Sequence, residues 1–247
     1  MSYPESDNIV IDNGQKVKAN SSVLSFAKVF FYMFIGLAIT TAVSFGVGYI
    51  FILAAKNGAT AQTLTNAYYG VMISSAIAVI ILSFVITFIT LRGKHSILVP
   101  AIIYCVLMGV LLSSFTILLE GNYWLLGMAF GITAGIFLLM TLIAVLSKGN
   151  MSPLLMLGMG LFLGAGILAL VNWIVGSSTI YWIVSFALFA AMMFITIFDI
   201  WNIKKICEKG AMSNNLALYC AFTLYVDFIY ILIRVLYFLI LIFGSRR

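Results

Sequence analysis

Residues 216–243 read LALYCAFTLYVDFIYILIRVLYFLILIF, and this stretch decides the fold class. It carries two charged side chains, Asp227 and Arg234, in a run that is otherwise apolar or weakly polar. The hydrocarbon core of a bilayer is about 30 Å thick, and roughly 20 residues of helix cross it. The stretch therefore predicts a membrane-spanning helix that holds an acid and a base.

Six further apolar stretches of similar length precede this one, with charged or turn-forming residues such as Arg92-Gly93-Lys94 between most of them. Strand-like alternation of apolar and polar residues is absent over these lengths, which argues against a β-barrel. We predict an all-α membrane protein with seven transmembrane helices. The predicted spans are 29–55, 68–91, 97–119, 123–146, 154–176, 179–199 and 216–243.

The composition agrees with a protein whose solvent is lipid. The chain of 247 residues is 64% hydrophobic and 8% charged, and its mean hydropathy is +1.19, whereas soluble domains carry about 25% charged residues. This excludes most soluble enzymes, nucleic-acid binders and secreted disulfide scaffolds. No nucleotide-binding motif is apparent, and we expect no enzymatic activity and no cofactor. The cysteines (Cys105, Cys207, Cys220) are odd in number and lack metal-site spacing, so we expect buried, inert thiols.

The net charge of +6 is spread over single basic residues between the spans. Basic residues collect on the cytoplasmic side of a membrane protein, and nine of them fall on the side of the amino terminus against three on the other. We therefore expect a cytoplasmic amino terminus and an external carboxyl terminus. Residues 1–25 are polar and are predicted to form a disordered tail before a transmembrane domain over 26–247. The nine are Lys16, Lys18, Lys28, Arg92, Lys94, Lys148, Lys204, Lys205 and Lys209, and the three are Lys56, Arg246 and Arg247.

Glycines recur at short spacing in the fourth and fifth spans. Small residues let membrane helices approach closely, so we predict that these glycines pack against neighbouring helices. They are Gly127, Gly131, Gly135, Gly158, Gly160, Gly164 and Gly166.

The last span has a polar side. At 100° per residue, a stripe about 100° wide contains Thr223, Asp227, Tyr230 and Arg234. A charge in hydrocarbon costs roughly 2.5–3.5 kcal/mol on insertion scales, so it normally meets a partner or water. Two interpretations stay open: a structural Asp227–Arg234 pair two turns apart, or a stripe that lines a wet path through the bundle.

A second carboxylate, Asp199, closes the sixth predicted span at its cytoplasmic end. The seventh span re-enters from that side, and Arg92 ends the second span there. Two carboxyl groups in a site of low dielectric do not both ionise readily, so we expect Asp199 and Asp227 to share a proton. When deprotonated they would bind a hard cation such as calcium.

These residues lie in segments that resemble the transmembrane Bax inhibitor motif family, in particular its short bacterial members. The most specific match, over residues 221–229 (AFTLYVDFI), is similar to the Leu-Tyr-Leu-Asp-Phe-Ile segment of the family's last helix. Residues 198–203 (FDIWNI) are similar to the end of its sixth helix. The similarity runs from about Phe30 to the end of the chain, with further matches at Tyr104, Gly109, Ser113, Thr133, Asn172 and in 147–152.

The resemblance implies a bundle of six helices around a central seventh, and a pH-sensitive calcium leak through it. It further implies that Asp199 and Asp227 are the aspartate pair that shares protons and binds calcium transiently. Arg92 takes the basic position that locks Asp199. Arg234 departs from the family, because it follows Asp227 by seven residues where bacterial relatives often have ten, and its role as a second charge partner stays open. Such a protein would sit in a bacterial inner membrane, with calcium and protons as its ligands.

Other functions stay open at this point. The main alternative is a non-transporting regulator of stress or cell death that binds and restrains other membrane proteins. An ion-coupled transporter is a weaker one, because no inverted repeat is apparent. A retinal receptor needs a lysine on its last helix, and none follows Lys209. A zinc hydrolase needs several His or Cys ligands, and His95 is the single histidine.

Overall fold

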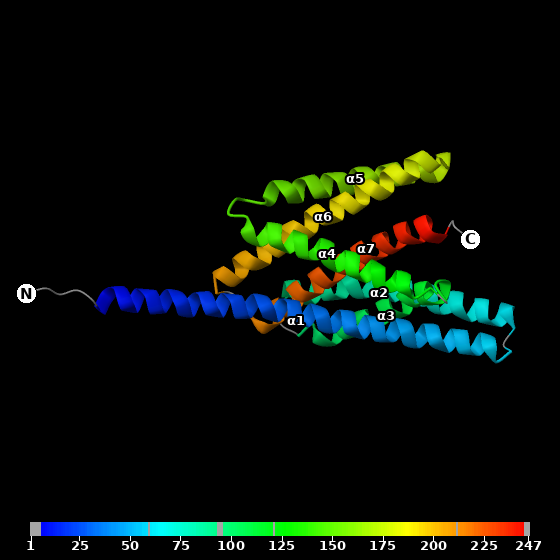
Figure 1. The fold of residues 1–247 in the computed structure, drawn as a ribbon, viewed down its shortest axis with the longest axis horizontal. Helices are drawn as coiled ribbons and strands as arrows, with labels where there is room; N and C mark the ends of the chain where they lie inside the picture. The colour runs from blue at the N-terminus through cyan, green and yellow to red at the C-terminus, as the bar shows by residue number, and fades with distance from the viewer. Residues whose placement is uncertain (1–5, 59, 93–95, 121, 211, 245–247) are drawn as a thin grey trace, which may run out of the picture. The chain divides into compact units, whose positions relative to one another are not determined.

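The structure, a computed structural model, describes residues 6–58, 60–92, 96–120, 122–210 and 212–244, and its account of side chains begins at Ser22. Over these residues it contains seven helices and no strand, which confirms the predicted fold class (Figure 1). All seven are long and apolar enough to cross a membrane. They are α1 (Ser6–Lys56), α2 (Ala61–Arg92), α3 (Leu98–Leu118), α4 (Trp124–Leu146), α5 (Ser152–Val175), α6 (Ser178–Glu208) and α7 (Asn214–Gly244).

The helices α1 and α6 extend farthest beyond the predicted spans. The structure continues α1 back to Ser6, into the stretch predicted to be disordered, because adding residues to an existing helix costs far less than nucleating one. α6 continues past Asp199 to Glu208. The added turns of α6 bury Ile200, Ile203 and Cys207, whose spacing of three and four residues forms one apolar face. Asp199 therefore lies inside a helix rather than at its end.

Parts of the topology argument lie outside the described residues. The residues concerned, which the structure does not describe, are Lys94, Arg246, Arg247 and residues 1–5 of the predicted tail. The orientation of the termini and the domain boundary at residue 26 stay predictions.

The chain forms two compact units, and α1, α4 and α7 each contribute to both. The first unit comprises residues 1–30 and 135–220, and the second comprises 31–134 and 221–247. The arrangement of six helices around α7 stays a prediction.

In the first unit, α5 and α6 lie side by side as a helical hairpin (Figure 1). Gly176 makes the turn between them with φ +68°, a left-handed conformation that favours glycine. Gly158 lies against α6, where an added Cβ would be 2.9 Å from a side-chain carbon of Ile195 and 3.1 Å from the carbonyl oxygen of Ala191. Gly158 thus packs between helices as predicted.

The ends of the helices in this unit are tied by lysines. Lys204 of α6 donates a hydrogen bond from Nζ to the carbonyl oxygen of Val145, at 2.7 Å, near the end of α4. The last carbonyl groups of a helix have no partner within the helix, and lysine side chains satisfy them well. Lys28 of α1 similarly donates to Oδ1 of Asn214, at 2.6 Å, at the start of α7.

In the second unit, α1 and α3 approach closely at Gly109. A Cβ at this position would be 2.7 Å from the carbonyl oxygen of Thr40 and 2.7 Å from the Cβ of Val43. Hydrogen is therefore the largest substituent that fits between the two helices here. The remaining glycines of the predicted packing faces behave differently: a Cβ would meet no atom within 4 Å at Gly127, Gly131, Gly135, Gly160, Gly164 or Gly166.

We expect Gly109→Ala to destabilise the protein, because backbone of α1 blocks the new methyl group and α1 must move away from α3. Overpacking of this kind costs about 1–3 kcal/mol. The midpoint of thermal unfolding of the purified protein measures the loss. Gly131→Ala is the matched control in α4, and an equal effect of the two variants would contradict the proposed close contact.

Candidate functional site

The candidate site is centred on Asp227, in the middle of α7. Its side chain is 5% exposed, although it belongs to a helix that crosses the membrane. Several residues around it on α7 are buried as well, including Leu224, Tyr225, Phe228 and Ile231. In its most apolar window, α7 has a larger buried share, 39%, than any other described span. The carboxyl group of Asp227 is therefore enclosed by protein.

The other predicted site residues on α7 differ in exposure. Thr223 and Arg234 are half-buried, whereas the side chain of Tyr230 is 53% exposed. Tyr230 thus lies on a surface of the structure rather than inside it. The prediction that Thr223 and Tyr230 line a path through the bundle stays a prediction.

Asp199 and Arg92 lie on other helices. Asp199 is half-buried on α6, in the first unit, and Arg92 is the last residue of α2, in the second unit, with an exposed side chain. The sharing of a proton between Asp199 and Asp227, and the locking of Asp199 by Arg92, stay predictions.

The described residues contain no group of three or more His, Cys, Asp and Glu side chains that could hold a metal ion. Calcium takes 6–8 oxygen ligands when it is held firmly. Within the described part of the chain, the residues offer fewer clustered carboxylates than a firmly held calcium ion needs.

A cavity of about 410 Å³ lies in the second unit between α1, α3, α4 and α7. The side of α7 that faces it carries Ile229, Leu232, Ile233 and Leu236. Two of these, Ile229 and Ile233, lie about 200° and 240° around the helix from Asp227, at about 100° per residue. This cavity is therefore lined by the apolar side of α7 and not by the predicted polar stripe.

Five residues with hydroxyl groups line this cavity, namely Tyr123 and four threonines and serines, and each of these four is bonded within the protein. Thr41 donates to the carbonyl oxygen of Leu37, at 2.8 Å. Ser44 and Thr116 share a hydrogen bond of 3.1 Å. The fourth, Thr40, is bonded to Cys105 and Tyr225. With these bonds made, the wall offers few groups to replace the water around an ion, so the cavity is chemically apolar.

The bonds of Thr40 fix α7 near the candidate site. The Thr40 hydroxyl donates to the carbonyl oxygen of Cys105, at 3.0 Å, and lies 2.6 Å from the hydroxyl of Tyr225. Because the single hydroxyl hydrogen of Thr40 is donated to Cys105, the Thr40 oxygen accepts the hydrogen bond that the Tyr225 hydroxyl donates. Tyr225 also packs edge-on against Tyr104, with ring centroids 6.2 Å apart, and Tyr104 packs against Phe222 at 4.9 Å. This cluster holds α1, α3 and α7 together two residues before Asp227.

Sequence reasoning missed this cluster. Tyr225 lies in the segment that carries the family resemblance, two residues before the acid, but its partner Thr40 is 185 residues away in the chain. The available signal was the pair Thr40-Thr41 within an otherwise apolar first span. Hydroxyls in membrane helices often bond a neighbouring helix, yet the sequence does not identify which one.

We expect Tyr225→Phe to lower the stability of the protein by about 0.6–2 kcal/mol, the value of a hydrogen bond between membrane helices. The midpoint of thermal unfolding in detergent or nanodiscs measures the change. The matched control is Tyr230→Phe, which removes a hydroxyl from an exposed side chain three residues beyond Asp227. A larger loss in the Tyr230 variant than in the Tyr225 variant would contradict the role of the Thr40–Tyr225 bond.

Comparison with known proteins agrees with the geometry of a membrane bundle. Residues 21–245 match the family described as "Bax1-I: Inhibitor of apoptosis-promoting Bax1". The chain is also similar to two relatives called inner membrane protein YbhL, from Escherichia coli strain K12 and from Escherichia coli O6:H1. Each is 29% identical to it over 255 residues, which cover 99% of this chain and 99% of the relative.

Proposed function

The chain belongs to the Bax inhibitor family of membrane proteins, and from that premise we propose that it is a pH-sensitive calcium leak channel of the bacterial inner membrane. The observation that carries the proposal is the carboxyl group of Asp227, 5% exposed inside a membrane-spanning helix. Ionisable residues in such positions are expensive to insert, and they commonly mark ion and proton pathways. The inner-membrane location is carried over from the relatives' printed name.

The first step of the proposed mechanism is proton sharing. Asp199 and Asp227 exchange one proton in the closed state, which avoids two negative charges in a site of low dielectric. Arg92 holds the ionised Asp199, and Arg234 offsets the charge of Asp227. The enclosed position of Asp227 supports this step, because a carboxyl group cut off from bulk water depends on a shared proton or a cation for neutrality.

The second step is opening. Loss of the shared proton as the pH rises leaves two carboxylates, whose repulsion favours a wider bundle and whose oxygens attract calcium. Calcium then crosses passively, down its concentration gradient. Because a ligand shifts a conformational equilibrium by its difference in affinity for the two states, calcium and protons act in opposite directions on the same pair.

We expect Asp227→Asn to lower calcium flux into proteoliposomes about tenfold or more and to flatten its dependence on pH. The amide has the shape of the protonated carboxyl group but releases no proton, so it holds the closed state; a tenfold change corresponds to about 1.4 kcal/mol. The readout is a calcium dye inside the vesicles across a pH series. In the unmodified protein, flux should rise as the pH rises.

Glu208→Gln is the matched control, because it removes a carboxylate at the exposed end of α6, where the Glu208 side chain is 55% exposed. It should keep the flux and the pH response. If Asp227→Asn leaves both unchanged in protein that is folded and inserted, the proposal is wrong.

A second candidate function is that of a regulator that restrains another membrane protein, as the printed description of the family suggests. A specific observation favours it: Gly160 and Gly164 lie one turn apart on α5, are exposed, and leave open space around an added Cβ. Small residues at a spacing of four are typical of contacts between membrane helices. In this case Asp227 is structural, and the flux measurement above separates the two functions.

A further inference from the structure

A second pocket, of about 310 Å³, lies in the second unit where three helices come to their ends. Phe51 and Ile52 come from the last turns of α1, Tyr68 and Tyr69 from the early turns of α2, and Glu120 follows the end of α3. The pocket is distinct from the 410 Å³ cavity, and it shares no lining residue with it. Its position at the helix ends places it at the level of the lipid headgroups.

Three aromatic rings form part of the wall of this pocket. The rings of Phe51 and Tyr68 meet almost at right angles, at 85°, with centroids 5.5 Å apart. Tyr68 and Tyr69 have centroids 6.1 Å apart and an angle of 62°. Such rings form a corner rather than a flat stack. Aromatic faces carry partial negative charge, and several of them around one space attract an organic cation.

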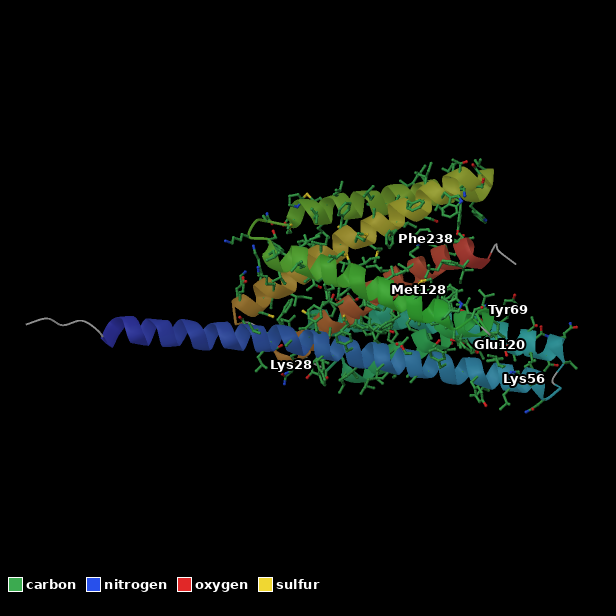
Figure 2. All side chains as sticks on the ribbon, viewed as in Figure 1. Lys28, Lys56, Tyr69, Glu120, Met128 and Phe238 are labelled. Carbon is green, nitrogen blue, oxygen red and sulfur yellow. The ribbon has the colours of Figure 1, made fainter. Side chains whose placement is uncertain are left out.

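A single carboxylate completes the site. The side chain of Glu120 lies within the pocket lining and forms an ion pair with Lys56, with 3.2 Å between Nζ and Oε1. Figure 2 shows Lys56, Glu120 and Tyr69 at the same end of α1. The Lys56 ammonium group thus demonstrates that an ammonium group can reach the Glu120 carboxylate. Both side chains are well exposed, 68% for Lys56 and 45% for Glu120, and exposed ion pairs are weak, so a competing cation displaces Lys56 easily.

We propose that this pocket binds an organic ammonium group, with Glu120 as its counter-ion and the rings of Phe51, Tyr68 and Tyr69 as its walls. The ligand chemistry is that of an alkylated or primary ammonium, supplied by a lipid headgroup or by a free amine. A bare metal ion fits poorly, because one carboxylate supplies too few oxygen ligands for calcium or magnesium. The proposal is independent of the calcium leak, since none of its residues takes part in that mechanism.

The test for a free amine is titration of the full-length protein with tetramethylammonium chloride against sodium chloride at equal ionic strength. The protein is isotope-labelled at tyrosine and held in phosphatidylglycerol nanodiscs. We expect saturable shifts of the tyrosine ring signals with tetramethylammonium alone. Glu120→Gln should weaken binding at least tenfold and Tyr69→Leu about fivefold, as expected for loss of a counter-ion and of one cation–π contact.

Lys56→Met gives the sharpest readout, because it removes the competing ammonium group and leaves the pocket walls in place. We expect tetramethylammonium to bind this variant about threefold to tenfold more tightly, since a weak exposed ion pair no longer has to be broken. An aromatic belt that merely anchors the helices in the membrane predicts no such gain. Tyr49→Leu is the matched control, because Tyr49 is an exposed tyrosine of α1 outside the pocket lining.

The lipid source is tested with the same variants. The protein is purified from a mixture of phosphatidylethanolamine and phosphatidylglycerol, and the lipids that stay bound are measured by mass spectrometry. Retention of phosphatidylethanolamine that depends on Glu120, without binding of tetramethylammonium, supports the proposal with a lipid headgroup as ligand. Failure to bind either probe, or binding that Glu120→Gln and Lys56→Met leave unchanged, would overturn the proposal.

Discussion

The cost of holding a carboxyl group away from water is the constraint on which the rest of this structure depends. Asp227 is 5% exposed in a helix that crosses the bilayer, where neither lipid nor bulk water stabilises its charge. The protein meets this cost by burying α7 more completely than its other described spans. It also fixes the helix close to the acid, through the Thr40–Tyr225 hydrogen bond and the rings of Tyr104 and Phe222.

The sequence was sufficient for the fold class, and it drew attention to the helix that carries Asp227. Apolar runs of about 20 residues leave few alternatives to membrane helices, because backbone polar groups in lipid must bond within the same segment. The charges of Asp227 and Arg234 in the last run singled out that helix. Membership of the Bax inhibitor family, expected from residues 221–229, was confirmed by the match over residues 21–245.

What the sequence did not predict depends on contacts between distant segments. The hydrogen bond of Thr40 with Tyr225 joins residues far apart in the chain, and the sequence around either hydroxyl does not identify its partner. The extension of α6 to Glu208 comes from the packing of Ile203 and Cys207, which lie among charged residues. The sequence also does not tell which glycines pack against a neighbouring helix. Gly158 packs against α6, whereas Gly164, on the same helix, leaves open space around an added Cβ.

The most direct test of the central claim is infrared spectroscopy of the protonated carboxyl band of the full-length protein in nanodiscs, followed as pH and calcium are varied. If Asp199 and Asp227 share a proton that calcium replaces, the band disappears as the pH rises and also when calcium is added at constant pH. Under the same account, Asp199→Asn and Asp227→Asn each alter the carboxyl band, because both groups share the proton. A carboxyl band that responds neither to calcium nor to the loss of Asp199 would contradict the account.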